Sequence, residues 1–381
     1  MNRSQAMEHF EQNTVIPRLQ DMLQRLESYY QVHKTQLAQS FWISIEEIIT
    51  GCEALQEQGQ QAALGYITFS LLRTSMLSGQ GLYLLEGSNR LWFLDEQAYS
   101  ICYDAAWAYD FLKPVETELL QTAKKYAGAI DPTDVRRWMM NTTAFVHQYV
   151  LALARYTLRL HEDKLMPALN RVRLERECEI RVGEYRDLSE IVYKVDRRER
   201  SAEELGNELS GRHGFAYSGE VFRHAELSQG DYTGIHLYYS DLRGSSCKGS
   251  LFTNGYLVGS RWDEADLCDA DFSGAFLAEA SFTGADLRDA SFRGCVGMAG
   301  LLAEKHWERP GYEPVCFTGA NLAGADFTGA WLPGADFRGA LHVDEAMLHG
   351  AWLEGAQFSS DVSVGLERMS KVATNRKLVE S

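Results

Sequence analysis

The 381-residue sequence lacks any run of about 18 apolar residues, and its opening stretch, MNRSQAMEHFEQ, is polar. A secretory leader needs an apolar segment near the start of the chain, and a membrane-spanning helix needs a longer one. We therefore expect a cytoplasmic protein with no membrane segment.

Grouped cysteines are missing as well. The seven cysteines are odd in number and scattered, and no two of them form a CxxC pair. A disulfide framework or a zinc site needs cysteines at paired spacings, so this distribution indicates a reducing cytoplasm.

The common catalytic motifs are also absent. The sequence has no GxSxG, P-loop, GxGxxG or HExxH pattern. Its ten histidines are dispersed, and His147 lies on the apolar face of a helix predicted over 133–161, where a core role is favoured. The alternative is a metal site formed by Glu46, Asp104, Asp110 and His147. We predict a protein that is not an enzyme and that holds no cofactor and no metal.

Positive charge is in deficit, with 37 Lys and Arg against 53 Asp and Glu, a net charge of −16. Between Asp163 and Gly219 arginines alternate with glutamates, so acids nearly cancel bases. Nucleic-acid binding relies on uncompensated cations, so we expect no direct binding of nucleic acid. This segment is predicted to be a solvated helix or hairpin that connects two domains, with a charged contact surface as the alternative.

What the sequence does contain is a five-residue repeat. Residues 265–294 read ADLCD ADFSG AFLAE ASFTG ADLRD ASFRG, with Ala first and Leu or Phe third in every pentad. We call the third residue the centre. Centres recur every five residues from Phe222 to Phe292, resume from Phe317 to Phe337 and, after a slip of one residue, run from Val343 to Phe358. Helices and strands do not have this period, whereas a solenoid of short stacked units does.

The pattern resembles the pentapeptide-repeat family over residues 220–360. The resemblance implies a right-handed quadrilateral β-helix, in which four pentads make one square turn with the small residue and the centre inside. The predicted fold is therefore an N-terminal helical domain followed by an all-β solenoid.

The N-terminal region, residues 1–162, is predicted to be a bundle of about six helices. Apolar residues recur at helical spacing, as at Leu19, Met22, Leu23 and Leu26. A change of period around Gly87-Ser88-Asn89 predicts one small hairpin within the bundle, and helical spacing returns over 95–112, 115–127 and 133–161.

Three further segments complete the predicted domain plan. Residues 163–219 are the charged connector, and its last part, 205–219, covers the open end of the solenoid. The repeat signature is lost over 296–314, which is interpreted as a loop or short helix or, alternatively, as a degenerate turn. Residues 361–381 carry apolar residues at helical spacing and are predicted to cap the last turn or to pair two copies into a homodimer.

Residues twenty apart should stack in columns if one turn has twenty residues. One predicted column is acidic, and it includes residues just before the centre and two residues after it; its carboxylates are Glu226, Asp266, Asp269, Asp286, Asp289 and Asp326. The opposite column runs through His236, Tyr256, Phe276, Val296 and Cys316, and a third ends in Trp331 and Trp352. The exposed aromatics Tyr256, Phe276, Trp331 and Trp352 are predicted to dock the helical domain or a partner, or to be scattered exposure.

Residues 220–360 hold 20 Asp and Glu against 9 Lys and Arg, which is most of the net negative charge. A rod of spaced carboxylates can imitate a nucleic-acid duplex and bind a basic groove. The resemblance implies this role on DNA gyrase or topoisomerase IV, since resistance proteins of the family act so. The alternative is that Asp before the centre only bonds turn backbone.

We therefore predict a binding protein that presents a rigid acidic rod to a protein partner, in its sharper form a DNA mimic giving antibiotic resistance or self-protection. The alternative is an adaptor whose helical domain carries the specific binding or enzymatic task, with the solenoid as a spacer.

Overall fold

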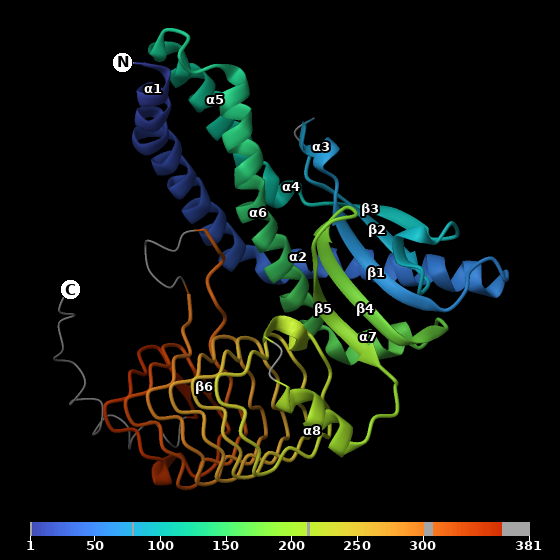
Figure 1. The fold of residues 1–381 in the computed structure, drawn as a ribbon, viewed down its shortest axis with the longest axis vertical. Coiled ribbons are helices and arrows are strands. Elements are labelled where there is room, and N and C mark those ends of the chain that lie inside the picture. The colour runs from blue at the N-terminus through green and yellow to red at the C-terminus, as the bar shows by residue number, and fades with distance from the viewer. Residues whose placement is uncertain (1, 78–79, 212–213, 301–307, 360–381) are drawn as a thin grey trace. The chain divides into compact units, whose positions relative to one another are not determined.

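The computed structural model of the chain describes residues 2–77, 80–211, 214–300 and 308–359 (Figure 1). The chain divides into two compact units between residues 197 and 198, and each unit is described by itself. Within the described residues, no helix combines the length and the apolar character that crossing a membrane requires.

The first unit contains long helices. They are α1 (Arg3–Phe10), α2 (Ile16–Glu57), α3 (Arg73–Leu77), α4 (Ala106–Tyr109), α5 (Leu112–Ala123), α6 (Pro132–Leu160) and α7 (Glu162–Leu169). A π-helical segment, Glu11–Val15, joins α1 to α2. Helix α6 begins at a capping box, because the Asp131 side chain accepts hydrogen bonds from the Thr133 and Asp134 backbone N–H groups.

The helices of this unit pack on a five-stranded sheet. Its strands are β1 (Leu64–Leu71), β2 (Leu82–Ser88), β3 (Tyr99–Asp104), β4 (Leu174–Glu184) and β5 (Ser189–Asp196), in the order β3-β2-β1-β4-β5. Strands β1 and β4 are parallel although about a hundred residues separate them, and all other pairs are antiparallel. The sheet thus unites the two ends of the unit.

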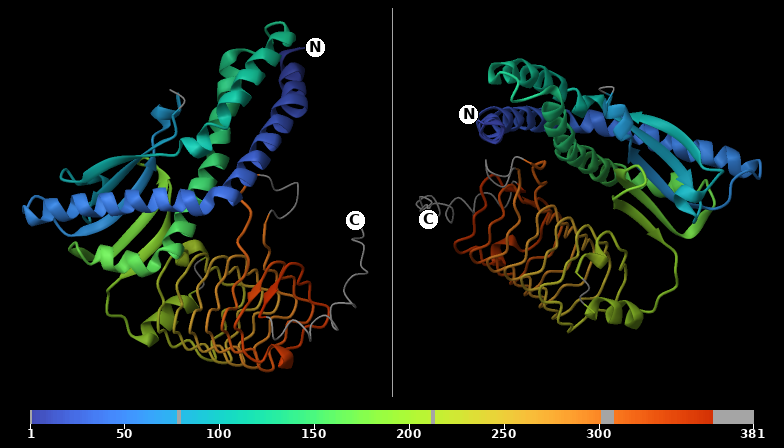
Figure 2. Two further views of the ribbon diagram at one scale, coloured as in Figure 1. Left: turned by 180° about the vertical axis from the view of Figure 1, so that it is seen from behind. Right: turned by 45° about the horizontal axis from the view of Figure 1, so that its top comes forward.

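One face of the sheet carries the core of the first unit. Helix α2 crosses this face, as the views from both sides show (Figures 1 and 2). The ring of Phe41 on α2 stacks on that of Phe69 on β1, with centroids 4.5 Å apart. Ile67, Phe69 and Leu71 are buried in this core. Thr68 and Ser70 alternate with them and belong to the opposite face.

The predicted helical region is confirmed, but the prediction of a helical bundle is wrong, because the helices pack on a five-stranded sheet. The predicted hairpin around Gly87-Ser88-Asn89 is wrong in its second strand, because β3 begins at Tyr99, after a 3₁₀ turn at Trp92–Leu94. Residues 95–112, predicted as helix, instead include β3 and α4. Strand β1, which lies between two helices, was not predicted at all.

The connector predicted over residues 163–219 is also corrected. Its first part contains α7, β4 and β5, which belong to the first unit. Cys178, Ile180 and Val182 alternate with charged residues along β4 and are buried in the sheet core. The charges therefore mark the second face of a strand, because successive strand residues point to opposite faces.

The second unit is a coil of stacked turns, preceded by helix α8 (Ala202–Ser210). From Val221 to Phe276, each residue just before a centre forms a parallel bridge with the residue twenty positions later. Short strands β6 (Asp336–Phe337) and β7 (Gln357–Phe358) and 3₁₀ turns at Gly214–Tyr217 and Val343–Glu345 complete the unit. The coil therefore repeats every twenty residues.

The core of the coil is a set of stacked centres. Leu267 and Phe272 are fully buried, as the repeat requires, and so are the alanines two residues before them. Ring centroids of Phe272 and Phe292 lie 5.0 Å apart, and those of Phe292 and Phe327 lie 4.9 Å apart. Leu205, Leu209 and Tyr217, which precede the first turn, join the same core cluster.

An insertion interrupts the stack. Ser281 pairs with Cys316, thirty-five residues later, so fifteen residues leave the stack after Val296. Gly300 and Tyr312 pair as an antiparallel bridge where the insertion leaves and returns. The later slip is a single extra residue, because Asp326 pairs with Met347. The helix predicted at 361–381 lies outside the described residues.

Candidate partner-binding surfaces of the coil

The bridging residues of the coil form four columns. Column 1 contains Val221, Asp241, Arg261, Ser281, Cys316, Asp336 and Gln357. Column 2 contains Glu226, Ser246, Asp266, Asp286, Asn321 and Leu341. Column 3 contains Asp231, Leu251, Asp271, Ser291, Asp326 and Met347. Column 4 contains His236, Tyr256, Phe276, Val296, Trp331 and Trp352.

The sequence places four residues in the wrong column, namely Asp326, Cys316, Trp331 and Trp352. Asp326 belongs to column 3 and not to the column of Asp266 and Asp286, and Cys316 follows Ser281 in column 1. The reason is the fifteen-residue insertion, which does not join the stack. Leaving out three pentads moves every later residue back by three columns, which on a four-column coil is the next column forward. Trp331 and Trp352 consequently extend the column of Phe276.

Two carboxylates of column 2, Asp266 and Asp286, are paired with cations. Lys248 Nζ lies 2.9 Å from Asp266 Oδ2, and Arg288 Nη2 lies 2.7 Å from Asp286 Oδ2. Hydrogen bonds from Arg288 lower the pKa of the Asp286 carboxyl. Column 2 therefore does not present these two carboxylates as free negative charges.

Asp326 has the same kind of pairing in column 3. Arg293 Nη1 lies 2.7 Å from Asp326 Oδ2, and the Thr328 backbone N–H donates to Oδ1 at 2.8 Å. Burial alone would raise the pKa of the Asp326 carboxyl, but these bonds outweigh it and the pKa is lowered.

Asp before a centre also stabilises the turn. Asp271 accepts from the Ser273 backbone N–H at 2.8 Å, and Asp336 accepts from that of Arg338 at 3.0 Å. Glu226 accepts from the Ser228 backbone N–H at 3.2 Å, and hydrogen bonding to Ser228 lowers the pKa of its carboxyl. Such local bonds satisfy donors that the turn leaves unpaired.

Asp269 and Asp289, which flank column 2, differ from the acids within it. They lie two residues after their centres, with φ of +59° and +58°, a region that Asp tolerates better than most residues. Neither carboxylate forms an ion pair or hydrogen bond within the described part of the chain. They are stacked one turn apart, so they make the free acidic surface of this column.

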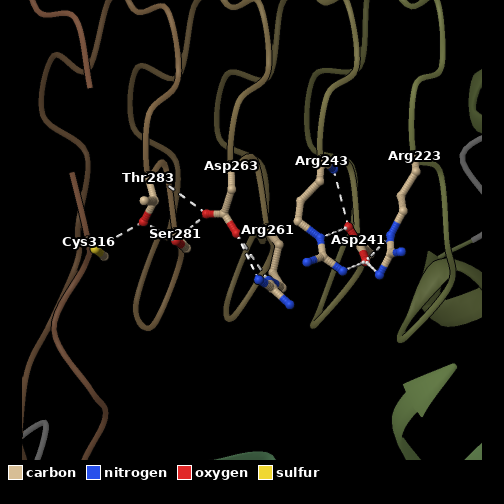
Figure 3. Close-up of polar contacts among 8 residues, drawn as sticks. All are labelled: Arg223, Asp241, Arg243, Arg261, Asp263, Ser281, Thr283 and Cys316. Atoms are coloured by element: carbon tan, nitrogen blue, oxygen red, sulfur yellow. Dashed lines mark hydrogen bonds and ion pairs between the residues drawn. The ribbon is translucent and has the colours of Figure 1, made fainter. Parts of the chain in front are cut away.

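Column 1 and its flanking residues form a polar ladder that the sequence did not reveal (Figure 3). Asp241 lies between Arg223 and Arg243, with N–O distances of 2.6 and 2.7 Å. In the next turns Arg261 pairs with Asp263 at 2.9 Å, and Asp263 in turn bonds Ser281. Opposite charges at neighbouring column positions could have indicated this ladder.

Column 4 presents several aromatic side chains, and Val296 lies between Phe276 and Trp331. Tyr256, Trp331 and Trp352 are 45%, 43% and 42% exposed, and Phe276 is half-buried. The His236 and Tyr256 rings are 4.7 Å apart, and Tyr312 at the base of the insertion packs on Phe276 at 5.9 Å. All four aromatics singled out in the sequence therefore lie in one column.

One cluster of potential metal ligands occurs among the described residues. Side-chain atoms of Asp266, Cys268 and Asp286 lie within 4.8 Å of one another. Lys248 and Arg288 already neutralise the two carboxylates. Burial and the neighbouring carboxylates raise the pKa of the Cys268 thiol to about 11, so the thiolate that metals prefer is disfavoured.

Comparisons with known proteins agree with the repeat. A model of the family of pentapeptide repeats matches residues 263–296 and 317–341 in eight copies. No curated protein matches the chain significantly.

Solved structures of other repeat proteins are similar to the chain. Full-length QnrB1, a plasmid-mediated fluoroquinolone resistance protein, is 18% identical, with 40% of this chain and 92% of that chain covered and a TM-score of 0.24. HetL of the cyanobacterium Nostoc, a pentapeptide-repeat protein involved in heterocyst differentiation regulation, is 20% identical, with 42% and 95% covered and a TM-score of 0.18. Values this low carry no functional argument.

Proposed function

Because its C-terminal region is built of pentapeptide repeats, we propose that this protein is a non-enzymatic binding protein whose coil presents column 4 to a protein partner. The four columns are then the sides of the square, right-handed coil that the resemblance implies.

The observation that carries this proposal is the aromatic row itself. Tyr256, Trp331 and Trp352 each leave over two fifths of their surface exposed. Tyr and Trp are the side chains that most often dominate protein interfaces, and contiguous exposed apolar surface marks interaction sites. The bridged backbone beneath the row fixes the spacing of the rings, so little conformational entropy is lost on binding.

A double variant, Trp331→Ser with Trp352→Ser, tests the proposal. We expect it to fold normally, because both side chains are outward, and to lose binding by a factor of ten or more, since interface Trp truncation costs about 2 kcal/mol or more. Quantitative affinity capture from the native cell, with cross-linking, measures the loss. Leu341→Ser with Met347→Ser, exposed residues of columns 2 and 3, is the control. An unchanged set of captured proteins in the Trp variant would contradict the proposal.

A second candidate is the sharper, acidic form, in which the coil mimics DNA and binds DNA gyrase or topoisomerase IV. Asp269 and Asp289 favour it, because these two carboxylates lie one turn apart beside column 2 and have no cation partner among the described residues. A gyrase supercoiling assay with rising protein and rising salt tests it. We expect inhibition or protection that weakens with salt.

Asp269→Asn with Asp289→Asn should abolish that effect while keeping residues that tolerate positive φ. The matched control is Asp271→Asn, which changes charge in column 3. No change in supercoiling at saturating protein would exclude the acidic form. The aromatic proposal would survive this result.

A further inference from the structure

A small hollow lies on the face of the first unit's sheet that carries Thr68 and Ser70, opposite the α2 core. It has a volume of about 10 Å³, enough for roughly one water-sized group. Thr68 and Ser70 on β1 and Glu86 on β2 line it, together with Phe93 and Tyr185 from two turns. This hollow is separate from the coil and from the function proposed for it.

Strand register brings the polar groups of the hollow together. Glu86 is directly opposite Thr68, and Thr68 is opposite Arg181 on β4. Ser70 lies two residues farther along β1 and therefore on the same face. Its row partner is Gly183, where a Cβ would come within 2.3 Å of the Leu188 carbonyl oxygen. The β4–β5 turn thus closes tightly beside the hollow.

Three groups in the hollow have no hydrogen-bond partner among the residues that the structure describes. Thr68 is 4% exposed and Ser70 is 8% exposed. Neither hydroxyl, nor the half-buried carboxylate of Glu86, makes a hydrogen bond or ion pair with any residue that the structure describes. Their oxygens are not sealed from solvent, so all three remain free to accept hydrogen bonds from a ligand that enters the hollow.

Arg181 and Arg186 also line the hollow, but they do not supply the missing partner. The Arg181 guanidinium bonds Glu179 Oε2 at 2.6 Å and the Ser189 carbonyl oxygen at 2.8 Å. Arg186 lies over the Tyr185 ring, 5.2 Å from its centroid, and only moderates the effect of burial on Glu86. Burial raises the pKa of the Glu86 carboxyl, so a bound cation would relieve an uncompensated charge.

We propose that the hollow binds a primary ammonium group carried on an aliphatic stem, either a lysine side chain or a free alkylamine. An ammonium has three N–H donors and no acceptor, which matches one carboxylate and two hydroxyls. The room for a single water-sized group excludes the larger guanidinium. Phe93 and Tyr185 are 44% and 38% exposed and offer apolar surface to the stem.

Titration of the full-length protein with two probes tests this site. The probes are n-butylammonium and Nα-acetyl-lysine methylamide, followed by calorimetry and by the fluorescence of Trp92, which also lines the hollow. We expect saturable binding of at least one. Equal binding of both shows that the ammonium and stem suffice, and binding of the lysine probe alone identifies a peptide lysine. Nα-acetyl-arginine methylamide should bind at least about tenfold more weakly, because its head is too large.

Variants locate the binding. Glu86→Gln should weaken it about tenfold or more, as expected for a lost charge-assisted hydrogen bond, and Thr68→Val about threefold. Glu96→Gln, at an exposed neighbouring position, should change nothing. Urea unfolding checks that each variant folds. The proposal is overturned if neither probe binds saturably, which would mean that the hollow holds only water. It is also overturned if the Glu86→Gln variant binds the probes as tightly as the unchanged protein, or if the arginine probe binds as tightly as the lysine probe.

Discussion

The two units bury phenylalanine rings by different kinds of contact. In the first unit, Phe41 packs on Phe69 across a helix–sheet interface, and the sheet below this core joins strands as distant in sequence as β1 and β4. In the coil, Phe292 stacks on Phe272, twenty residues earlier, and on Phe327, thirty-five residues later. A damaged contact should therefore spread through the first unit but remain local in the coil.

The largest expected effect tests this difference directly. Phe41→Ala and Phe292→Ala each remove a fully buried ring and should each lower the free energy of unfolding by about 3–5 kcal/mol. Hydrogen exchange measured by peptide should show faster exchange over the whole first unit for Phe41→Ala. For Phe292→Ala the increase should concentrate in neighbouring turns. Equal acceleration along the entire coil would contradict the local behaviour.

Acid should destabilise the two units over different pH ranges. Burial lowers the pKa of His147 to about 4, against about 6.5 in an unfolded chain. The unfolded state then binds more protons between these values. The first unit should lose up to about 3 kcal/mol as pH falls from about 6.5 to about 4.

The coil should respond only at lower pH. The pKa values of Asp286 and Asp326 are lowered, so their stabilisation is complete above the unfolded value of about 3.9 and is lost as pH falls through the folded pKa. Urea unfolding followed by exchange in each unit measures both slopes. His147→Gln should flatten the slope of the first unit alone; an unchanged slope would exclude His147 as its source.

A smaller effect is expected at the start of the second unit. The Ser201 side chain caps α8 by accepting from the Glu204 backbone N–H at 3.1 Å. Ser201→Ala should cost about 1 kcal/mol of helix stability, whereas Ser201→Asn should retain the cap. Exchange rates over 202–210 and the first turn report the change. The first unit should show none.

The smallest effect concerns the surface of the coil. Arg293 is 60% exposed in its pair with Asp326, so a double-mutant cycle with Arg293→Gln and Asp326→Asn should give a coupling of about 0.2–1 kcal/mol. Equilibrium urea unfolding of the four proteins measures it. A coupling well above this range would mean that charge ladders, and not stacked centres, hold the coil together.

How far the sequence predicts each unit follows from the same difference. Leu267 and Phe272 could be placed inside because a period of five leaves a single way to stack. Sequence could not say whether the fifteen residues after Val296 join the stack, so it misplaced Asp326 and Cys316. Of the four aromatics named from the sequence, Tyr256, Trp331 and Trp352 are exposed and Phe276 is half-buried. The sequence divided them between two columns, and their common column appears only with the bridges.

The first unit was harder to predict because its contacts are distant in sequence. The alternation of Cys178, Ile180 and Val182 with charged residues is a strand signal, yet the density of charge suggested a solvated connector. The hollow at Glu86 depends on β1 pairing with β4, a parallel contact across more than a hundred residues. No local pattern in the sequence predicts a pairing between strands so far apart.

The insertion after Val296 has a consequence for how this molecule can change over generations. Apart from the single extra residue before Met347, outward positions repeat every twenty residues. Adding or deleting five residues within the stack would therefore move every later residue to a neighbouring column and break up the aromatic column. A segment that loops out is exempt from this arithmetic. Related proteins can thus differ freely in the length of the insertion between Gly300 and Tyr312. The stacked part should gain or lose length only in whole twenty-residue turns.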